Sequence, residues 1–299
     1  MRIALIADTH LSPRSPECVA NWHAARRAVG RLAPRLTVNL GDITLDGQKH
    51  PGEFQFAAQL AQYWPTPMRC VPGNHDVGDA CGESPLDARL LAAYVAHFGA
   101  DHWSFRAGRW LLLGVNVQLM GSGSALEQAQ WRWIEDQAAL AGSHGRTALF
   151  LHRPIRPLEA GPAHECGCYV PAAACERLLS GPLRSSLRLI VSGHAHQYLD
   201  RMQDGVRHVW MPSSGFVKPD HTQARVGEQL VGIGLLELKE DSAAFDLWCP
   251  DGMVRHEVSG LQAFHPYTVG RDLGGAVDDD IFPVSMEIDH VRVYQAVPK

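Results

Sequence analysis

Short apolar runs alternate with longer segments of helical periodicity through much of the chain. The runs are rich in Leu, Val and Ile, which is typical of buried strands. The longer segments repeat apolar residues every three or four positions, which predicts helices. The predicted strands of this part are 3–7, 36–40, 68–71, 147–151 and 187–191. Strands that alternate with helices favour parallel pairing, with the crossover helices on the faces of the sheet.

Proline and glycine residues set the ends of the predicted helices. Pro16 is expected at the first position of a helix, and Pro34 is expected to end that helix. The residues beyond Asp76, as far as Glu83, lack periodicity and predict a loop. The predicted helices are 15–33, 52–64, 84–98, 124–140 and 171–179.

Other segments show the two-residue alternation of antiparallel strands. Residues 103–105 and 110–115 predict a hairpin that turns at Gly108. After residue 198 the pattern predicts an antiparallel meander of four strands, at 199–202, 206–211, 231–238 and 243–249. We therefore predict an α/β fold with two packed sheets and outer helices.

Side chains that can bind metal ions follow five of the predicted strands directly. These side chains are Asp8, His10, Asp42, Asn74, His75, His152, His194 and His196. A loop such as 71–76, with Asn, His and Asp, is by itself most often a polar turn. The carboxyl ends of neighbouring strands, however, meet at one edge of a sheet, so all five loops can converge there. Together they predict a single site.

The order of the motifs resembles that of the calcineurin-like metallophosphoesterase superfamily. The motifs are Asp-x-His, Gly-Asp, Gly-Asn-His-Asp, a lone His and Gly-His-x-His. The resemblance runs from residue 1 to about Leu238, and it implies a four-layer α-β-β-α sandwich of two mixed β-sheets flanked by helices. The loops at 8–11 and 71–76 are most similar to the class III cyclic-nucleotide and glycerophosphodiester phosphodiesterase group. Purple acid phosphatases and serine/threonine protein phosphatases carry different residues at these motifs.

The resemblance also implies a dinuclear metal site. Asp42 would bridge the two ions, because a carboxylate offers two oxygens. Asp8, His10 and His196 would complete one metal site, and Asn74, His152 and His194 would complete the other. A ligand set of His, Asp and Asn without Cys suits Mn, Fe, Zn or Co.

His75 is the candidate catalytic residue, for which the resemblance implies contact with the phosphate and protonation of the leaving oxygen. The alternative is that His75 only supports a metal ligand. In many relatives an acidic residue three places after the bridging Asp orients this histidine. Leu45 holds that place here and the acid is Asp46. Either Asp46 substitutes for the missing acid, or the orienting contact is absent.

Phosphodiester hydrolysis needs a nucleophile at neutral pH and positive charge beside the phosphoryl oxygens. Two metal ions about 3.5–4 Å apart supply both. We therefore predict a dinuclear metal-dependent phosphoesterase in which a metal-bridging hydroxide attacks a small phosphodiester, of the cyclic nucleotide or glycerophosphodiester type. The alternative is a phosphomonoesterase or nucleotide pyrophosphatase with the same site. A non-catalytic scaffold is disfavoured, because all the candidate ligands are present.

Composition narrows the partners further. The 299 residues are 45% apolar and 20% charged with a net charge of −5, which is typical of a globular protein and disfavours a nucleic-acid partner. The sequence shows neither a membrane-spanning run nor room for a secretory signal before the first strand, so we expect a cytoplasmic protein without a membrane partner. The expected partner is a small phosphate ester, and a homo-oligomer remains open.

The seven cysteines are scattered, which predicts reduced thiols. Residues 164–168 could form a soft-metal site, but incidental thiols are favoured because no matching second pair exists. Long irregular segments such as 153–175 are often lids or substrate loops. We predict a catalytic domain at 1–260 and a C-terminal extension at 261–299 that forms a clasp or hairpin on it. His208 and His221 could line the substrate pocket, although packing or surface roles are favoured.

Overall fold

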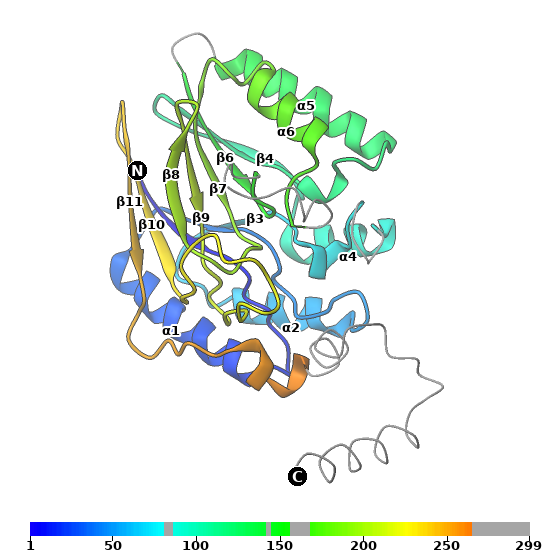
Figure 1. The fold of residues 1–299 in the computed structure, drawn as a ribbon, viewed down its shortest axis with the longest axis vertical. Helices are drawn as coiled ribbons and strands as arrows, with labels where there is room; N and C mark the ends of the chain where they lie inside the picture. Colours follow the sequence, from blue (N-terminus) through cyan, green and yellow to red (C-terminus); the bar gives the residue numbers. More distant parts are fainter. Residues whose placement is uncertain (81–85, 142–144, 156–167, 265–299) are drawn as a thin grey trace, which may run out of the picture.

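The computed structural model describes residues 1–80, 86–141, 145–155 and 168–264 (Figure 1). The predictions for 156–167 and 265–299 lie outside the described residues. They include most of the expected substrate loop, the soft-metal alternative at 164–167 and the terminal hairpin.

The first sheet has five strands in the order β11-β10-β1-β2-β3. Their bounds are β1 Arg2–Ile6, β2 Leu36–Asn39, β3 Met68–Cys70, β10 Ile233–Leu238 and β11 Ala243–Trp248. The pairs β1–β2 and β2–β3 are parallel, as the alternation of strands and helices predicts. β10 pairs antiparallel with β1, so the sheet is mixed.

The second sheet has six strands in the order β4-β5-β6-β7-β9-β8. Their bounds are β4 Trp103–Ala107, β5 Trp110–Gly114, β6 Arg146–Leu151, β7 Leu187–Ser192, β8 Leu199–Gln203 and β9 Val206–Trp210. The predicted β4–β5 hairpin is present, and Gly108 turns it with a φ of 61°. β5, β6, β7 and β9 pair in parallel, so this sheet is mixed as well.

The two sheets pack face to face, and each is covered by helices on its outer side (Figure 1). Alternate residues of β1 explain the layers. Ile3 and Leu5 lie in the core between the sheets, whereas Ala4 and Ile6 lie in the core under α1. The four-layer α-β-β-α sandwich is therefore confirmed.

The helices lie on the faces that their apolar residues require. α1 Pro16–Leu32, α2 Gly52–Ala61 and α4 Ala88–Phe98 contribute to the core outside the first sheet. α5 Ala125–Ala141 and α6 Ala172–Ser180 contribute to the core outside the second sheet. Among the described helices, none is both long enough and apolar enough to cross a bilayer.

Three sequence predictions are wrong in detail. The predicted meander is two hairpins in different sheets, because β8–β9 pairs with β7 whereas β10–β11 pairs with β1. The predicted loop after residue 76 begins inside a short helix, α3 Asn74–Val77, whose first turn Asp76 stabilises by accepting the Gly73 N–H. α4 begins later than predicted, because the Asp87 carboxylate caps it by accepting the Arg89 N–H.

Candidate metal centre

The backbone is strained where the candidate ligands lie. Seven described residues other than glycine have a positive φ, and five of them are candidate ligands. These five are Asp8, His10, Asp42, His194 and His196. Side chains rarely adopt this left-handed conformation, and such strain concentrates at functional sites. The strand-end loops are therefore built to direct these side chains inward.

Two glycines allow the strand-end loops to approach one another. A Cβ on Gly193 would lie 2.7 Å from Oδ2 of Asp8. A Cβ on Gly73 would collide with the backbone and the carboxylate of Asp42. Only glycine fits at these positions, which explains why the motifs contain it.

Asp8, His10 and His196 form one buried cluster. Nε2 of His10 lies 3.2 Å from Nε2 of His196, which in turn lies 3.5 Å from Oδ1 of Asp8. The Asp8 carboxylate also accepts the backbone N–H of His194 at 2.9 Å, so it ties the first loop to the last. The three side chains could hold one metal ion.

A second cluster surrounds His152. Its Nε2 lies 3.3 Å from Oδ2 of Asp42, 3.1 Å from Nδ1 of His194 and 3.2 Å from Oδ1 of Asn74. Asp42, His152 and His194 could hold an ion, and Asp42 also belongs to a group with His10 and His75. Asp42 therefore lies between the two clusters. The structure thus brings together all eight residues that the sequence singled out.

Hydrogen bonds behind two imidazoles fix which nitrogen faces the site. Nδ1 of His152 lies 2.8 Å from the carbonyl oxygen of Leu40, and Nδ1 of His196 lies 2.9 Å from that of Phe216. A carbonyl can only accept, so Nδ1 carries the proton in both rings. When the ring is neutral, its Nε2 presents a lone pair to a cation.

The charge states of three histidines also suit metal binding. Burial lowers the pKa of His10, His194 and His196 well below the usual range, so these rings are neutral and can act as ligands. Burial raises the pKa of the Asp8 carboxyl to about 7.

Asp42 behaves differently from Asp8. Burial would raise the pKa of its carboxyl, but the positive charges of His152 and His75 hold that pKa well below the usual range. The candidate ligands are two buried carboxylates, an amide oxygen and four imidazoles, with no thiolate. Such a donor set suits divalent or trivalent ions of intermediate hardness.

His75 lies at the open side of the clusters. Its side chain is 28% exposed, against 3% for the Asp42 side chain, and its Nε2 lies 4.0 Å from Oδ2 of Asp42. Nδ1 lies 2.6 Å from the carbonyl oxygen of Leu45. The orienting contact therefore exists, and a backbone carbonyl makes it. The structure thus shows a third arrangement beside the two that the sequence left open, a substitution by Asp46 or a missing contact.

Asp76 is a buried residue whose role the sequence did not reveal. Its carboxylate accepts the backbone N–H groups of Ile43, Thr44 and Gly73 and the hydroxyl of Thr44, at 2.8 to 3.2 Å. It thereby joins the loop that carries Asp42 to the loop that carries His75. The sequence signal for this role was the position of Asp76, two residues after Asn74 and third in a helical turn, where an acid can accept a backbone N–H at the start of the helix.

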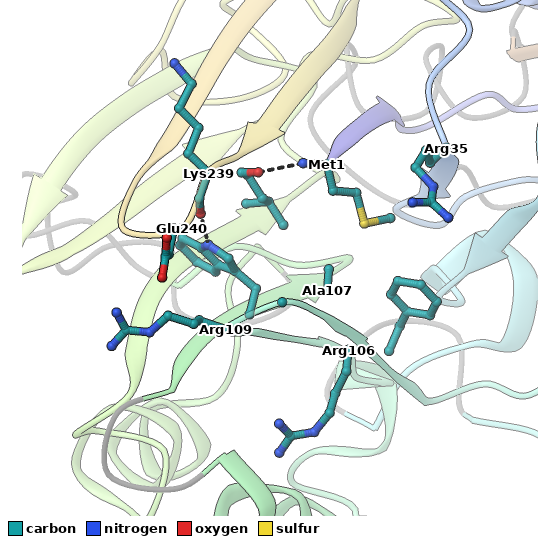
Figure 2. A pocket seen from close by; sticks show the side chains of 11 residues that line it. Met1, Arg35, Arg106, Ala107, Arg109, Lys239 and Glu240 are labelled. Carbon is teal, nitrogen blue, oxygen red and sulfur yellow. Dashed lines mark hydrogen bonds between the residues drawn. The ribbon is translucent and has the colours of Figure 1, made fainter.

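Two cavities lie away from these clusters. One cavity, of about 570 Å³, lies beside Met1 and Arg35, at the amino ends of β1 and β2 (Figure 2). The candidate ligands instead follow the carboxyl ends of the strands. The other, of about 340 Å³, contains His208 together with residues of α6. Burial lowers the pKa of His208 to about 4, which agrees with a packing role rather than a place in the substrate pocket.

Comparison with known proteins agrees with the geometry in indicating a phosphoesterase of the metal-binding type. Residues 1–198 match the family described as Calcineurin-like phosphoesterase. The 3′,5′-cyclic adenosine monophosphate phosphodiesterase CpdA of Escherichia coli (strain K12) is 27% identical over 235 residues, which are 72% of this chain and 76% of that protein. The serine/threonine-protein phosphatase CPPED1 of Pongo abelii is 25% identical over 185 residues, which are 58% of this chain and 57% of that protein. For several relatives the chain therefore spans about half of the relative's length.

A solved structure shares the fold. A dimetal phosphatase from Danio rerio superimposes with a TM-score of 0.59 at 16% identity, and the match covers 83% of this chain and 95% of that one. The family match covers most of the chain and includes every strand-end loop described above. The chain therefore belongs to the calcineurin-like phosphoesterase family and is a metal-dependent phosphoric ester hydrolase.

Proposed function

We propose that the chain hydrolyses a small phosphodiester with two metal ions. Asp8, His10 and His196 would hold one ion, Asn74, His152 and His194 would hold the other, and Asp42 would be the ligand shared by both. The observation that carries this proposal is the position of Asp42, which belongs to two of the three potential metal-binding groups found among the described residues. Mn, Fe, Zn and Co all suit this donor set.

The side chains of the site have separate tasks in the proposed reaction. When bound, the ions supply a water of lowered pKa and positive charge beside the phosphoryl oxygens. The Leu45 carbonyl holds the proton on Nδ1 of His75, which leaves Nε2 to exchange a proton with the substrate. His75 thus protonates the leaving oxygen, and its exposure allows a substrate to reach it.

The substrate class rests on the relatives. CpdA is a cyclic nucleotide phosphodiesterase by its name, and the loops at 8–11 and 71–76 resemble the same group. We therefore favour a cyclic nucleotide or a glycerophosphodiester. The match to the phosphatase CPPED1 supports the second candidate, a phosphomonoesterase or nucleotide pyrophosphatase with the same site.

A substrate panel separates these candidates. We would compare kcat/KM for 3′,5′-cyclic AMP, glycerophosphocholine, 5′-AMP and a dinucleotide polyphosphate with the metal-loaded protein. The proposal predicts that one of the two diesters is the best substrate. A preference for 5′-AMP or the dinucleotide would replace it with the second candidate. Hydrolysis of none despite two bound ions would indicate a narrowly specific pocket, and no metal binding at all would favour the scaffold.

We infer that the extension from residue 261 begins packed on the catalytic domain. Leu261 and Phe264 are buried against Cys18 and Phe216 of the catalytic domain. The first residues of the extension thus lie on that domain, as a clasp would. The cytoplasmic location stays a prediction.

Metal binding is expected to release protons. Burial opposes a charge on His152, but the carboxylates of Asp42 and Asp8 raise its pKa to about 9. His152 is therefore protonated at pH 7 without metal, and Asp8, with a pKa of about 7, is partly protonated. An ion must displace these protons, so its affinity should fall as the pH drops from 9 to 6.

Calorimetric titration with Mn²⁺ measures this release. In buffers of different ionisation enthalpy at pH 7, we expect about one to two protons to be released per chain when both sites fill. An affinity that is constant from pH 6 to 9, with no proton release, would contradict the assignment of His152 and Asp8 as ligands.

A further inference from the structure

His10 lacks the backbone hydrogen bond that orients three other imidazoles of the site. Nδ1 of His75, His152 and His196 each lies within 2.9 Å of a backbone carbonyl. Nδ1 of His10 is buried and has no hydrogen-bond partner within the described part of the chain. A histidine that binds a metal almost always donates its second N–H to a partner, which fixes the ring. Something else must therefore hold the His10 ring.

Aromatic rings surround His10 instead. Phe216 lies against its face, with ring centroids 4.8 Å apart and planes 33° apart. Phe264 approaches it edge-on at 5.9 Å and 83°. Phe264 also packs against Phe216 at 4.5 Å and 64°. A face contact and an edge contact together define the plane of the His10 ring.

Phe216 acts on both histidines of the same cluster. Its ring centroid lies 4.5 Å from that of His196, and its carbonyl oxygen accepts the Nδ1 proton of His196. Both phenylalanines are almost fully buried, with Phe216 1% exposed and Phe264 3% exposed. Neither ring can turn away from the histidines without opening a cavity.

Both aromatic residues come from outside the part of the chain that matches the family. The match ends at residue 198, whereas Phe216 lies between β9 and β10. Phe264 ends the short 3-10 helix η3 Gln262–Phe264. Their cluster also contains Val258, in η2 Val258–Gly260, and Leu261. The segment 258–264 therefore packs beside the candidate metal site, which it contacts through Phe264.

We propose that Phe264, through Phe216 and by direct contact with His10, is a positioning residue for the metal ion held by Asp8, His10 and His196. This inference rests on the proposed function, because it takes His10 as a ligand. Without the Phe264 ring, Phe216 and His10 gain space to rotate, and Nδ1 of His10 has no hydrogen-bond partner among the described residues to restore the orientation of the ring. The contacts that hold the Phe264 ring are with His10 and Phe216, which lie at the first ion's ligands, so we expect the affinity for the second ion to change much less.

Titration of the metal-free full-length chain with Mn²⁺ tests this inference. We expect Phe264→Ala to weaken one of the two binding events by about 10- to 100-fold, as changes to residues behind a ligand do. The other event should stay within about twofold. Asp8→Asn, which removes a ligand of the same ion, identifies the binding event to which the loss belongs. Phe264→Leu, which keeps most of the buried volume, should act in the same direction by a smaller factor.

Leu178→Ala is the matched control, because Leu178 is buried in the core under α6 and takes no part in the aromatic cluster. We expect it to lower the melting temperature without changing either affinity. Wild-type affinity at both sites in both Phe264 variants would overturn the inference, and so would an equal loss of affinity in Leu178→Ala. If the wild-type chain binds fewer than two ions, the proposed function fails instead.

Discussion

Replacement of Asp42 with alanine is expected to lower kcat/KM for the diester by at least about 10³-fold. Two metal ions contribute several kcal/mol of transition-state stabilisation, and each 1.4 kcal/mol is tenfold in rate. Oδ2 of Asp42 lies 3.3 Å from Nε2 of His152. Asp42 belongs both to the potential metal-binding group with His152 and to the one with His10. Its loss should therefore remove at least one ion and separate the remaining ligands.

Elemental analysis of the purified variant, together with kcat/KM, measures this effect. Asp200→Asn is the control, because Asp200 on β8 pairs with Arg207 on β9 and belongs to none of the potential metal-binding groups found among the described residues. It should keep two ions and the wild-type rate. An Asp42→Ala variant with two ions and full activity would contradict the bridging role.

The second large effect is expected for His75→Ala. This change should lower kcat by about 10²- to 10⁴-fold, the usual contribution of a general acid. The variant should keep two ions, because the proposed ligand set does not include His75. Metal content and kcat, measured on the same preparation, separate this outcome from loss of metal.

Asp46→Asn is the matched change in the neighbouring loop. Because the Leu45 carbonyl holds Nδ1 of His75, the Asp46 carboxylate is not needed to orient that ring. We expect activity within about threefold of wild type, far from the 10²-fold scale of a lost general acid. A loss as large as that of His75→Ala would show that Asp46 orients His75 after all. Unchanged turnover in His75→Ala would reduce His75 to a supporting residue.

Most of the sheet strands and their order along the chain could be predicted, because a buried strand needs an apolar run whatever its neighbours are. Their partners could not. β8–β9 and β10–β11 have the same alternating pattern, yet they extend different sheets. The long connection from β9 to β10 crosses between the sheets, and nothing in strand periodicity records that crossing.

The candidate site, too, could be predicted only in part. The side chains at the strand ends could be found, since they follow apolar runs in a fixed order. The partners that orient them could not. Leu45 acts through its backbone carbonyl, which its side chain does not reveal. Phe264 meets His10 only after the chain has folded back over more than two hundred residues, and a single aromatic residue has no pattern that announces such a contact.

The central claim is that hydrolysis requires two metal ions at one site. Its most direct test is a titration of metal-free protein with Mn, Fe, Zn or Co while the hydrolysis of bis(p-nitrophenyl) phosphate and p-nitrophenyl phosphate is followed. The account predicts that diester cleavage appears as the second ion binds and reaches its plateau at two ions per chain. Full activity with one ion per chain, or in the metal-free protein, would contradict it.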